Sequence, residues 1–225
     1  MVSEKITVAD QLDKMRRDWD ARARENARHY VATGKDHWTD EDFFASGEMA
    51  IGGDILNDMG NVCQGKDPRE LRVLEIGCGA GRVTRALARV FGEVHAVDIS
   101  GAMVECARAA LQSFPNAHIY QNNGLDLSVV PQLQFDFAYS NYVFQHIPSY
   151  EIIENYVREV YRLLRPGALF KFQLQGGVIP NVRPDDTWVG VGFSPEQAAG
   201  MAYRCGFDLR YQINAGKTAL LALVL

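Results

Sequence analysis

Apolar side chains recur at every third or fourth position from residue 6 to residue 31, which is the period of an α-helix. A polar segment that contains Gly34 interrupts this pattern. A second helix is predicted from about residue 40 to residue 59, and a loop is predicted at 60–70. The apolar stripe of the first helix consists of Val8, Leu12, Met15, Trp19, Ala23, Ala27 and Tyr30.

From residue 71 onward, short apolar runs alternate with amphipathic stretches. This alternation predicts an α/β fold in which helices cover both faces of a parallel sheet. The hairpin-like end of the chain predicts that one late strand runs antiparallel. The predicted strands are 72–77, 93–99, 117–123, 135–141, 168–175, 208–214 and 218–225. The predicted helices are 81–91, 101–114, 150–164 and 194–206.

The composition is that of a globular protein, with 47% hydrophobic and 23% charged residues among 225. This length suits one domain with a substantial core, or one domain with a cap. Apolar runs are too short for a membrane span, and the N-terminal residues lack the pattern of a signal peptide. Four cysteines without CxxC spacing indicate reduced thiols, so we expect a cytoplasmic protein without a membrane partner.

The net charge of −5 bears on the partners of the protein. A protein that grips a nucleic-acid backbone usually carries a surplus of basic residues. No such surplus is present, so we expect a small-molecule substrate and no nucleic acid. The sequence leaves the oligomeric state open between a monomer and a homodimer.

The stretch VLEIGCGAGRV at 73–83 places Glu75 and three glycines at the end of an apolar strand. In open α/β sheets, ligands bind beyond the carboxyl ends of the strands, and glycines let a cofactor approach the backbone. The spacing is G-x-G-x-G, which does not match the dinucleotide fingerprint G-x-G-x-x-G. Two interpretations are open: a nucleotide-type cofactor binds at this turn, or the glycines only allow a tight turn in the backbone.

Asp98 ends the next predicted strand, roughly 20 residues after the first glycine, where an acid meets the ribose of a bound nucleotide. A carboxylate accepts two hydrogen bonds from a diol, and both NAD and S-adenosylmethionine offer one. Asp98 could instead belong to the start of the following helix, but Ser100 already suits the N-cap position.

Six motifs in order carry a family resemblance: VLEIGCGAGRVTRAL, VHAVDIS, NNGLDLS, FDFAYSNYVFQHIP, LLRPGALFKF and FSPEQAAGMAYRCGF. From residue 70 to residue 225 the chain resembles the class I S-adenosylmethionine-dependent methyltransferases, and specifically small bacterial proteins with a type 11/12 methyltransferase domain. The resemblance implies a Rossmann-like, seven-stranded, mostly parallel sheet with helices on both faces. It also implies an N-terminal helical cap at 1–65 and a core at 66–225 with a substrate-side loop at 176–193.

The resemblance further implies the cofactor S-adenosylmethionine, which leaves as S-adenosylhomocysteine. Asp98 would hold the ribose, and the oxygen of Asn123 would accept from the adenine amino group. Arg82 would either pair with the methionine carboxylate or lie in solvent. The methionine end would be surrounded by Glu75, Gly77, Gly79 and Gly81, with Asn141 near it. The adenine would be flanked by Ile99 and Met103 and would meet the backbone of Gly124 and Leu125.

Methyl transfer from a sulfonium is an in-line displacement that depends mainly on alignment of the two reactants. A base is needed only where the acceptor arrives protonated, as an alcohol or phenol does. His146 follows the strand at 135–141 and is the candidate base, although it could instead shape its loop. No cluster of His, Cys and Asp has metal-ligand spacing, so no metal is expected.

Two segments are candidates for the substrate wall. The cap contributes Tyr30 and Trp38, while Trp19 is more consistent with packing in the core. The loop at 176–193 is long for a connection inside a compact domain, and such loops are often functional. The predicted substrate residues are Tyr30, Trp38, Tyr142, Arg183 and Trp188.

The resulting hypothesis is an S-adenosylmethionine-dependent methyltransferase that acts on O, N, S or C of a small molecule. Alternatives are a methyltransferase for a protein or an RNA, and a non-catalytic protein that binds S-adenosylmethionine. An NAD-dependent oxidoreductase is disfavoured by the glycine spacing and by the lack of a Tyr-x-x-x-Lys pair.

Overall fold

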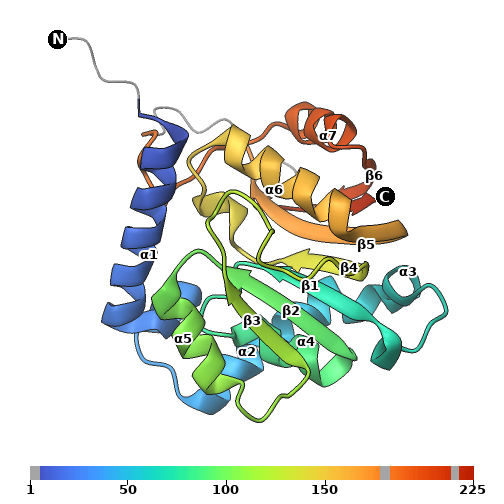
Figure 1. Ribbon diagram of the computed structural model, residues 1–225, viewed down its shortest axis with the longest axis horizontal. Helices are drawn as coiled ribbons and strands as arrows, with labels where there is room; N and C mark the ends of the chain where they lie inside the picture. The colour runs from blue at the N-terminus through green and yellow to red at the C-terminus, as the bar shows by residue number, and fades with distance from the viewer. Residues whose placement is uncertain (1–5, 178–182, 214–217) are drawn as a thin grey trace.

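A computed structural model describes residues 6–177, 183–213 and 218–225 (Figure 1). The strands are β1 (Arg72–Ile76), β2 (Glu93–Asp98), β3 (Ala117–Gln121), β4 (Phe135–Ser140), β5 (Leu164–Gln175), β6 (Asp208–Ile213) and β7 (Thr218–Val224). The α-helices are α1 (Val8–Val31), α2 (Asp40–Asp54), α3 (Met59–Cys63), α4 (Arg82–Val90), α5 (Gly101–Ala110), α6 (Tyr150–Leu163) and α7 (Pro195–Arg204). Three short 3₁₀ helices are η1 (Leu56–Asp58), η2 (Pro68–Glu70) and η3 (Phe144–His146).

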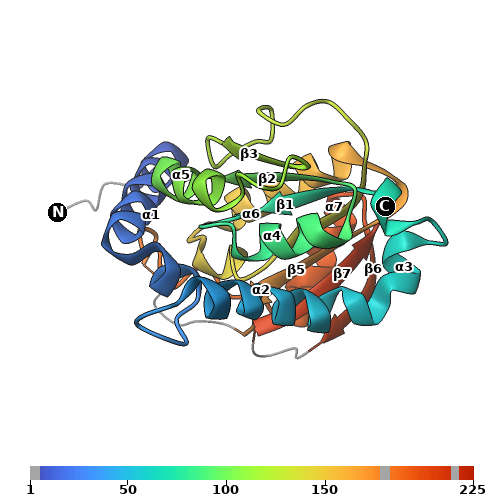
Figure 2. The same ribbon diagram turned by 90° about the horizontal axis from the view of Figure 1, so that it is seen from below.

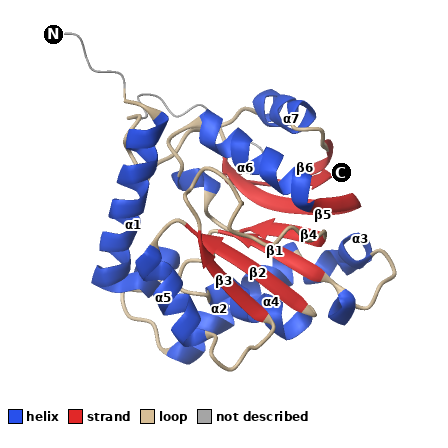
Figure 3. Cartoon of the chain, in the orientation of Figure 1, coloured by secondary structure: helices blue, strands red, loops and turns tan. Residues whose placement is uncertain are grey.

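The seven strands form one sheet in the order β3-β2-β1-β4-β5-β7-β6 (Figure 3). The five strands from β3 to β5 run parallel, and β7 is antiparallel to both of its neighbours. The predicted fold, with its antiparallel late strand, is confirmed. Strand order reverses between β1 and β4, and ligands of open α/β sheets bind at such a switch point.

Several element boundaries differ from the prediction, and α5 ends at Ala110 rather than at residue 114. The strand β5 begins at Leu164, directly after α6, because Leu164 already pairs with Phe135 across an irregular register. The second helix ends at Asp54 rather than near residue 59, and a 3₁₀ turn separates it from α3.

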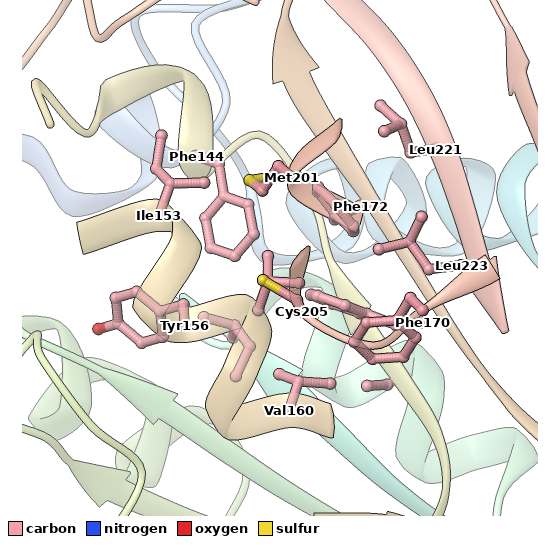
Figure 4. Packing of buried hydrophobic residues seen from close by; sticks show 14 of the residues in the cluster. Phe144, Ile153, Tyr156, Val160, Phe170, Phe172, Met201, Cys205, Leu221 and Leu223 are labelled. Atoms are coloured by element: carbon pink, nitrogen blue, oxygen red, sulfur yellow. The ribbon is translucent and has the colours of Figure 1, made fainter. Parts of the chain in front are cut away.

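Helices lie on both faces of the sheet (Figure 2), and alternate side chains of each inner strand face opposite helical layers, as the pleat requires. On β1, Val73 packs with residues of α2 and α4, whereas Leu74 packs with residues of α6. On β5, Phe170 and Phe172 join the α6 and α7 side, where Phe144, Ile153 and Met201 complete the larger core (Figure 4). Helices on both faces exclude water from the middle of the sheet.

The two long N-terminal helices pack differently. Helix α1 lies against α5, while α2 lies along α4 (Figure 2). Phe43 and Ile51 of α2 are fully buried, so this helix belongs to the core as much as to a cap. The division at residue 65 stays a prediction. No helix in the described ranges is long and apolar enough to cross a membrane, and all four cysteines are free.

Close packing of α2 against α4 depends on Gly47. A β-carbon at this position would overlap the backbone carbonyl of Arg82, the first residue of α4. Gly53 lies in the same helix, and a β-carbon added to it would have no atom within 4 Å.

Gly47→Ala is therefore expected to lower the free energy of unfolding by about 1–3 kcal/mol, because α2 must move away from α4. Gly53→Ala is the matched control in the same helix and should raise stability by ~0.5–1 kcal/mol through helix propensity. Urea denaturation of both variants measures the difference. Equal stabilities for the two variants would contradict the packing assigned to Gly47.

Candidate active site

A cavity of about 690 Å³ lies at the carboxyl ends of β1, β2 and β4. Helix α1 and the segment that precedes α7 close its outer side. The predicted residues that line it are Gly77, Gly79, Arg82, Asp98, Ile99, Met103, Asn141, His146, Tyr30, Trp38, Tyr142 and Trp188. The predicted residues outside its lining are Glu75, Gly81, Asn123, Gly124, Leu125 and Arg183.

The glycine loop is a tight turn that also faces the cavity. Gly77 and Gly79 have φ values of 74° and 51°, a region that favours glycine. A β-carbon on Gly77 would collide with Val143, and one on Gly79 would collide with Val31. Gly81 begins α4 and packs against α5, so its role is in helix packing.

Asp98 is tied to the loop and to the next helix by backbone amides. Its Oδ2 accepts from the Gly79 amide at 2.8 Å, and its Oδ1 accepts from the Ser100 amide at 2.9 Å. Burial outweighs these bonds and raises the pKa of Asp98 to about 6. The hydroxyl of Ser100 accepts from the Met103 amide and so caps α5, as predicted. The N-cap position of α5 is therefore held by Ser100 and not by Asp98.

Arg82 is buried rather than solvated, which removes the second of its two predicted settings. Its Nη2 donates to Asn141 Oδ1 at 2.5 Å, and its Nη1 donates to the carbonyl of Ser46. Asn141 in turn donates to the hydroxyl of Tyr139, which donates to Asp54 at 2.6 Å. This chain of bonds fixes the guanidinium at the cavity wall, and its Nε has no partner among the described residues.

Glu75 lies within β1 and is 2% exposed. Burial raises its pKa to about 7, and its Oε2 lacks a hydrogen-bond partner in the described part of the chain. A buried carboxyl without a partner is costly, and such groups concentrate at functional sites.

Asn122, and not Asn123, reaches the cavity. Asn122 is buried, its Nδ2 donates to the hydroxyl of Tyr156 at 2.7 Å, and its Oδ1 has no partner among the residues described. The Oδ1 of Asn123 instead accepts from the amides of Leu125 and Asp126, which closes a local turn. Asn122 and Asn123 are adjacent in the sequence. They differ only in the direction in which the pleat at the end of β3 points their side chains.

Of the predicted residues near Asn122, Gly124 and Leu125 lie behind the cavity wall, whereas Ile99 and Met103 form part of it. Gly124 lies behind Ile99, whose side chain a β-carbon on Gly124 would strike. Leu125 donates its amide to Asn123 and so belongs to the same turn. Ile99 and Met103 reach the cavity itself and give this end an apolar wall.

His146 is fixed by its Nδ1, which lies 2.6 Å from the carbonyl oxygen of Trp188. A carbonyl oxygen only accepts, so Nδ1 carries a proton and Nε2 keeps its lone pair when the ring is neutral. Gln145 donates to this Nε2 at 3.2 Å. Burial lowers the pKa of His146, so the ring is neutral near pH 7 with an accepting nitrogen.

Three aromatic side chains surround His146 on the outer half of the cavity. Trp19 meets it edge-on, with ring centroids 5.3 Å apart, and Trp188 lies 5.0 Å away. Tyr30 packs edge-on against Trp188. Trp19 therefore lines the site, which the regular stripe of the first helix did not indicate.

Tyr142 has a φ of 55°, which is unusual for a residue with a large side chain. Its amide donates to Gln173 at 2.7 Å, and this bond holds the strained turn that follows β4. Its ring is about half exposed at the cavity edge. Strained backbone of this kind concentrates at functional sites.

The segment from residue 183 to residue 189 is bonded to α1. Gln11 donates to the carbonyl of Pro184, Asp18 accepts from the Thr187 hydroxyl at 2.6 Å, and Arg22 donates to the Thr187 carbonyl. Arg183 itself pairs with Asp185 at the surface, away from the cavity lining. Residues 178–182 of the predicted substrate loop lie outside the described residues.

A family model described as a methyltransferase domain matches residues 73–167. A malonyl-[acyl-carrier protein] O-methyltransferase of Enterobacter lignolyticus is 32% identical over 130 residues, which are 56% of this chain and 47% of that protein. The chain spans about half the length of the curated relatives it matches.

Solved structures reproduce the fold over nearly the whole chain. A complex of DhpI with S-adenosylhomocysteine has a TM-score of 0.66 at 19% identity and covers 97% of this chain and 98% of its own. Magnesium protoporphyrin IX methyltransferase from Synechocystis PCC 6803 with bound S-adenosylmethionine has a TM-score of 0.68 at 16% identity, with coverage of 96% and 97%.

The fold and the glycine loop define a class I, Rossmann-like methyltransferase fold. Residues 73–167 match a methyltransferase domain, and the relative and the solved structures reported above resemble this chain in sequence and in fold, as the resemblance of its motifs predicted.

The raised pKa of Glu75 generates a pH dependence of stability. The folded-state pKa of about 7 lies above the ordinary value of 4.5, so the Glu75 carboxyl stays protonated to a higher pH in the folded protein than in the unfolded chain. The contribution of Glu75 to the free energy of unfolding is therefore largest below about pH 4.5 and declines up to about pH 7.

Glu75→Gln is expected to make this decline shallower in the ligand-free protein, because the neutral amide needs no proton. Urea denaturation at several values between about pH 5 and about pH 8 measures the slope. Glu105→Gln, at an exposed position of α5, should keep the wild-type slope. Identical slopes for wild type and Glu75→Gln would show that the Glu75 carboxyl is not destabilised by burial.

Proposed function

We propose that the chain is an S-adenosylmethionine-dependent methyltransferase that methylates a hydroxyl oxygen of a small, planar, largely apolar molecule. The observation that carries the proposal is His146, which lines the same cavity as Asp98 and whose Nε2 keeps an acceptor lone pair when the ring is neutral. Asp98 thus makes one end of the cavity suitable for the ribose of a cofactor, and His146 makes the other end suitable for removing a proton from the acceptor.

The donor and acceptor groups of the described residues fit S-adenosylmethionine. Asn122 Oδ1 and Arg82 Nε are buried polar atoms without partners, and both residues line the cavity. An unpaired buried acceptor and an unpaired buried cation are costly in an isolated protein, and a ligand with an amino group and a carboxylate would satisfy both. The volume of about 690 Å³ is within the usual range for cofactor sites.

Each end of the cofactor would meet a group of suitable chemistry. Asp98 would accept hydrogen bonds from the ribose diol, and Asn122 would accept from the adenine amino group between the apolar Ile99 and Met103. Arg82, held by Asn141, would bind the methionine carboxylate. Glu75 lies behind the cavity lining, and the nearby ammonium group would favour its ionised form, which would supply a compensating negative charge. When bound, the cofactor supplies a methyl group on a sulfonium, which is already activated for displacement.

The acceptor is proposed from the outer half of the cavity. Trp19, Trp188 and Tyr30 provide flat apolar surfaces, which favour a planar substrate. When a substrate hydroxyl replaces the Gln145 amide as the donor to His146 Nε2, this nitrogen can remove the hydroxyl proton as oxygen attacks, while the Trp188 carbonyl holds the ring through Nδ1. A thiolate or a carboxylate would need no such base. The O-methyltransferase that is 32% identical to this chain supports oxygen as the acceptor atom, and the choice of a hydroxyl over a carboxylate rests on His146.

Methylation of a protein or an RNA is the alternative. Helix α1 and the 183–189 segment are bonded to each other beside the cavity, so a large acceptor would have to part them. The net charge of −5 disfavours RNA further. A small molecule needs no such rearrangement.

Asp98→Ala is expected to weaken binding of S-adenosylhomocysteine by ~1.5–3 kcal/mol, the value of charge-assisted hydrogen bonds. Isothermal titration calorimetry measures this directly. Asp208→Asn is the control, because Asp208 is exposed at the start of β6, the edge strand next to β7. Unchanged affinity in Asp98→Ala would remove this residue from the cofactor site.

His146→Ala is expected to lower kcat for the hydroxyl acceptor by ~10²–10⁴-fold, with little change in cofactor affinity. Since burial lowers the pKa of His146, wild-type activity should persist below the ordinary histidine value of 6.5 before it declines. The variant should lose this acidic limb of the pH profile. His118→Ala, at the opposite end of β3, should retain wild-type turnover. An unaltered kcat in His146→Ala would assign the residue to loop structure alone.

A further inference from the structure

Three potential metal ligands meet at the amino ends of β2 and β3. Glu93 Oε1 lies 2.9 Å from His95 Nε2 and 3.5 Å from His118 Nε2. All three ligand atoms lie within 4.8 Å of one another. This Glu-His-His cluster is at the end of β2 opposite Asp98, so it is separate from the cavity described above.

The register of the sheet, rather than spacing in the sequence, forms the cluster. His95 and His118 are direct partners in the parallel pair of β2 and β3, with ring centroids 4.7 Å apart. Glu93 precedes His95 by two positions and therefore lies on the same face of the sheet. His95 is 2% exposed, whereas the side chain of His118 is 40% exposed. His95 is thus a buried ligand, whereas His118 is an exposed ligand whose side chain can change position to bind an ion.

Outer hydrogen bonds hold two of the ligands. Arg72 donates to Glu93 Oε2 at 2.7 Å, which leaves Oε1 on the side of the histidines. The hydroxyl of Tyr120 lies 3.0 Å from His95 Nδ1. A hydroxyl can donate or accept, so Nδ1 keeps a partner in either tautomer, including the one that leaves the Nε2 lone pair free. Metal-binding histidines characteristically have such a partner at the second ring nitrogen.

We propose that Glu93, His95 and His118 bind a divalent zinc-like cation that joins β2 to β3. Two imidazoles and one carboxylate form a ligand set that zinc uses in proteins, with water completing the tetrahedron. At this end of the sheet the ion would have a structural role, because the cofactor groups lie at the other end. The competing explanation is an ion-pair network, in which His95 donates to Glu93 and no cation binds.

The test uses full-length protein without a polyhistidine tag. Zn²⁺ is titrated by calorimetry, and Co²⁺ serves as a spectroscopic probe of the ligands. Wild type is expected to bind one equivalent of either ion and to melt at a higher temperature with the metal. The Co²⁺ complex should show tetrahedral visible bands without a thiolate charge-transfer band, because no cysteine belongs to the cluster.

Three variants separate the cluster from other sites. His118→Ala removes an exposed ligand with little effect on the core and should weaken Zn²⁺ binding by at least ~10–100-fold. Tyr120→Phe keeps its ring but removes the hydroxyl, and should weaken binding by ~10-fold. His37→Ala, at an exposed histidine before α2, should bind as wild type does.

Loss of affinity in His118→Ala and Tyr120→Phe, with normal binding in His37→Ala, supports the proposal. Equal affinities in all four proteins, a thiolate band in the Co²⁺ spectrum, or no binding by wild type at micromolar metal would each overturn it.

Discussion

The Asp98 carboxylate is the interaction on which the arrangement of the site depends. It accepts the amides of Gly79 and Ser100, and so joins the turn after β1 to the start of α5. Ser100 then donates its hydroxyl to Asp20 of α1, whose carboxylate also accepts the Ala102 amide. One buried acid thereby connects the glycine loop, the end of β2 and the helix that borders the cavity. Enclosing the Asp98 carboxylate costs free energy, and a ligand with hydroxyl donors at this point would offset that cost.

The position of α1 has a second consequence, for the acceptor half of the cavity. The helix holds the 183–189 segment through Asp18 and Arg22 and carries Trp19 on the same face. Trp188 in that segment supplies both an aromatic wall and the carbonyl that orients His146. Movement of α1 would therefore change the proposed cofactor contacts, the proposed substrate wall and the orientation of His146 together. Such coupling suits an enzyme whose rate depends on alignment of two reactants.

The sequence predicted the fold and most of the residues that line the cavity, but not the contacts that position their side chains. The glycine loop and Asp98 are local features at strand ends, so their meeting point follows from a parallel sheet. Asn122 differs from Asn123 only in the direction of its side chain after β3, which no spacing rule determines. The polar chain from Arg82 to Asp54 contains hydrogen bonds between residues 59 and 85 positions apart, and the tautomer of His146 depends on Trp188, 42 positions away. Tertiary contacts of this kind carry no signal in a single sequence.

Transfer of a labelled methyl group from S-adenosylmethionine tests the central claim most directly. Purified protein would be incubated with pooled phenols, alcohols, carboxylates, thiols and amines, and with a cell extract, and mass spectrometry would identify the labelled product. The account predicts that label enters a planar, hydroxyl-bearing small molecule and is bound through oxygen. Label found on nitrogen or sulfur, on protein or RNA, or nowhere despite confirmed binding of the cofactor would contradict it.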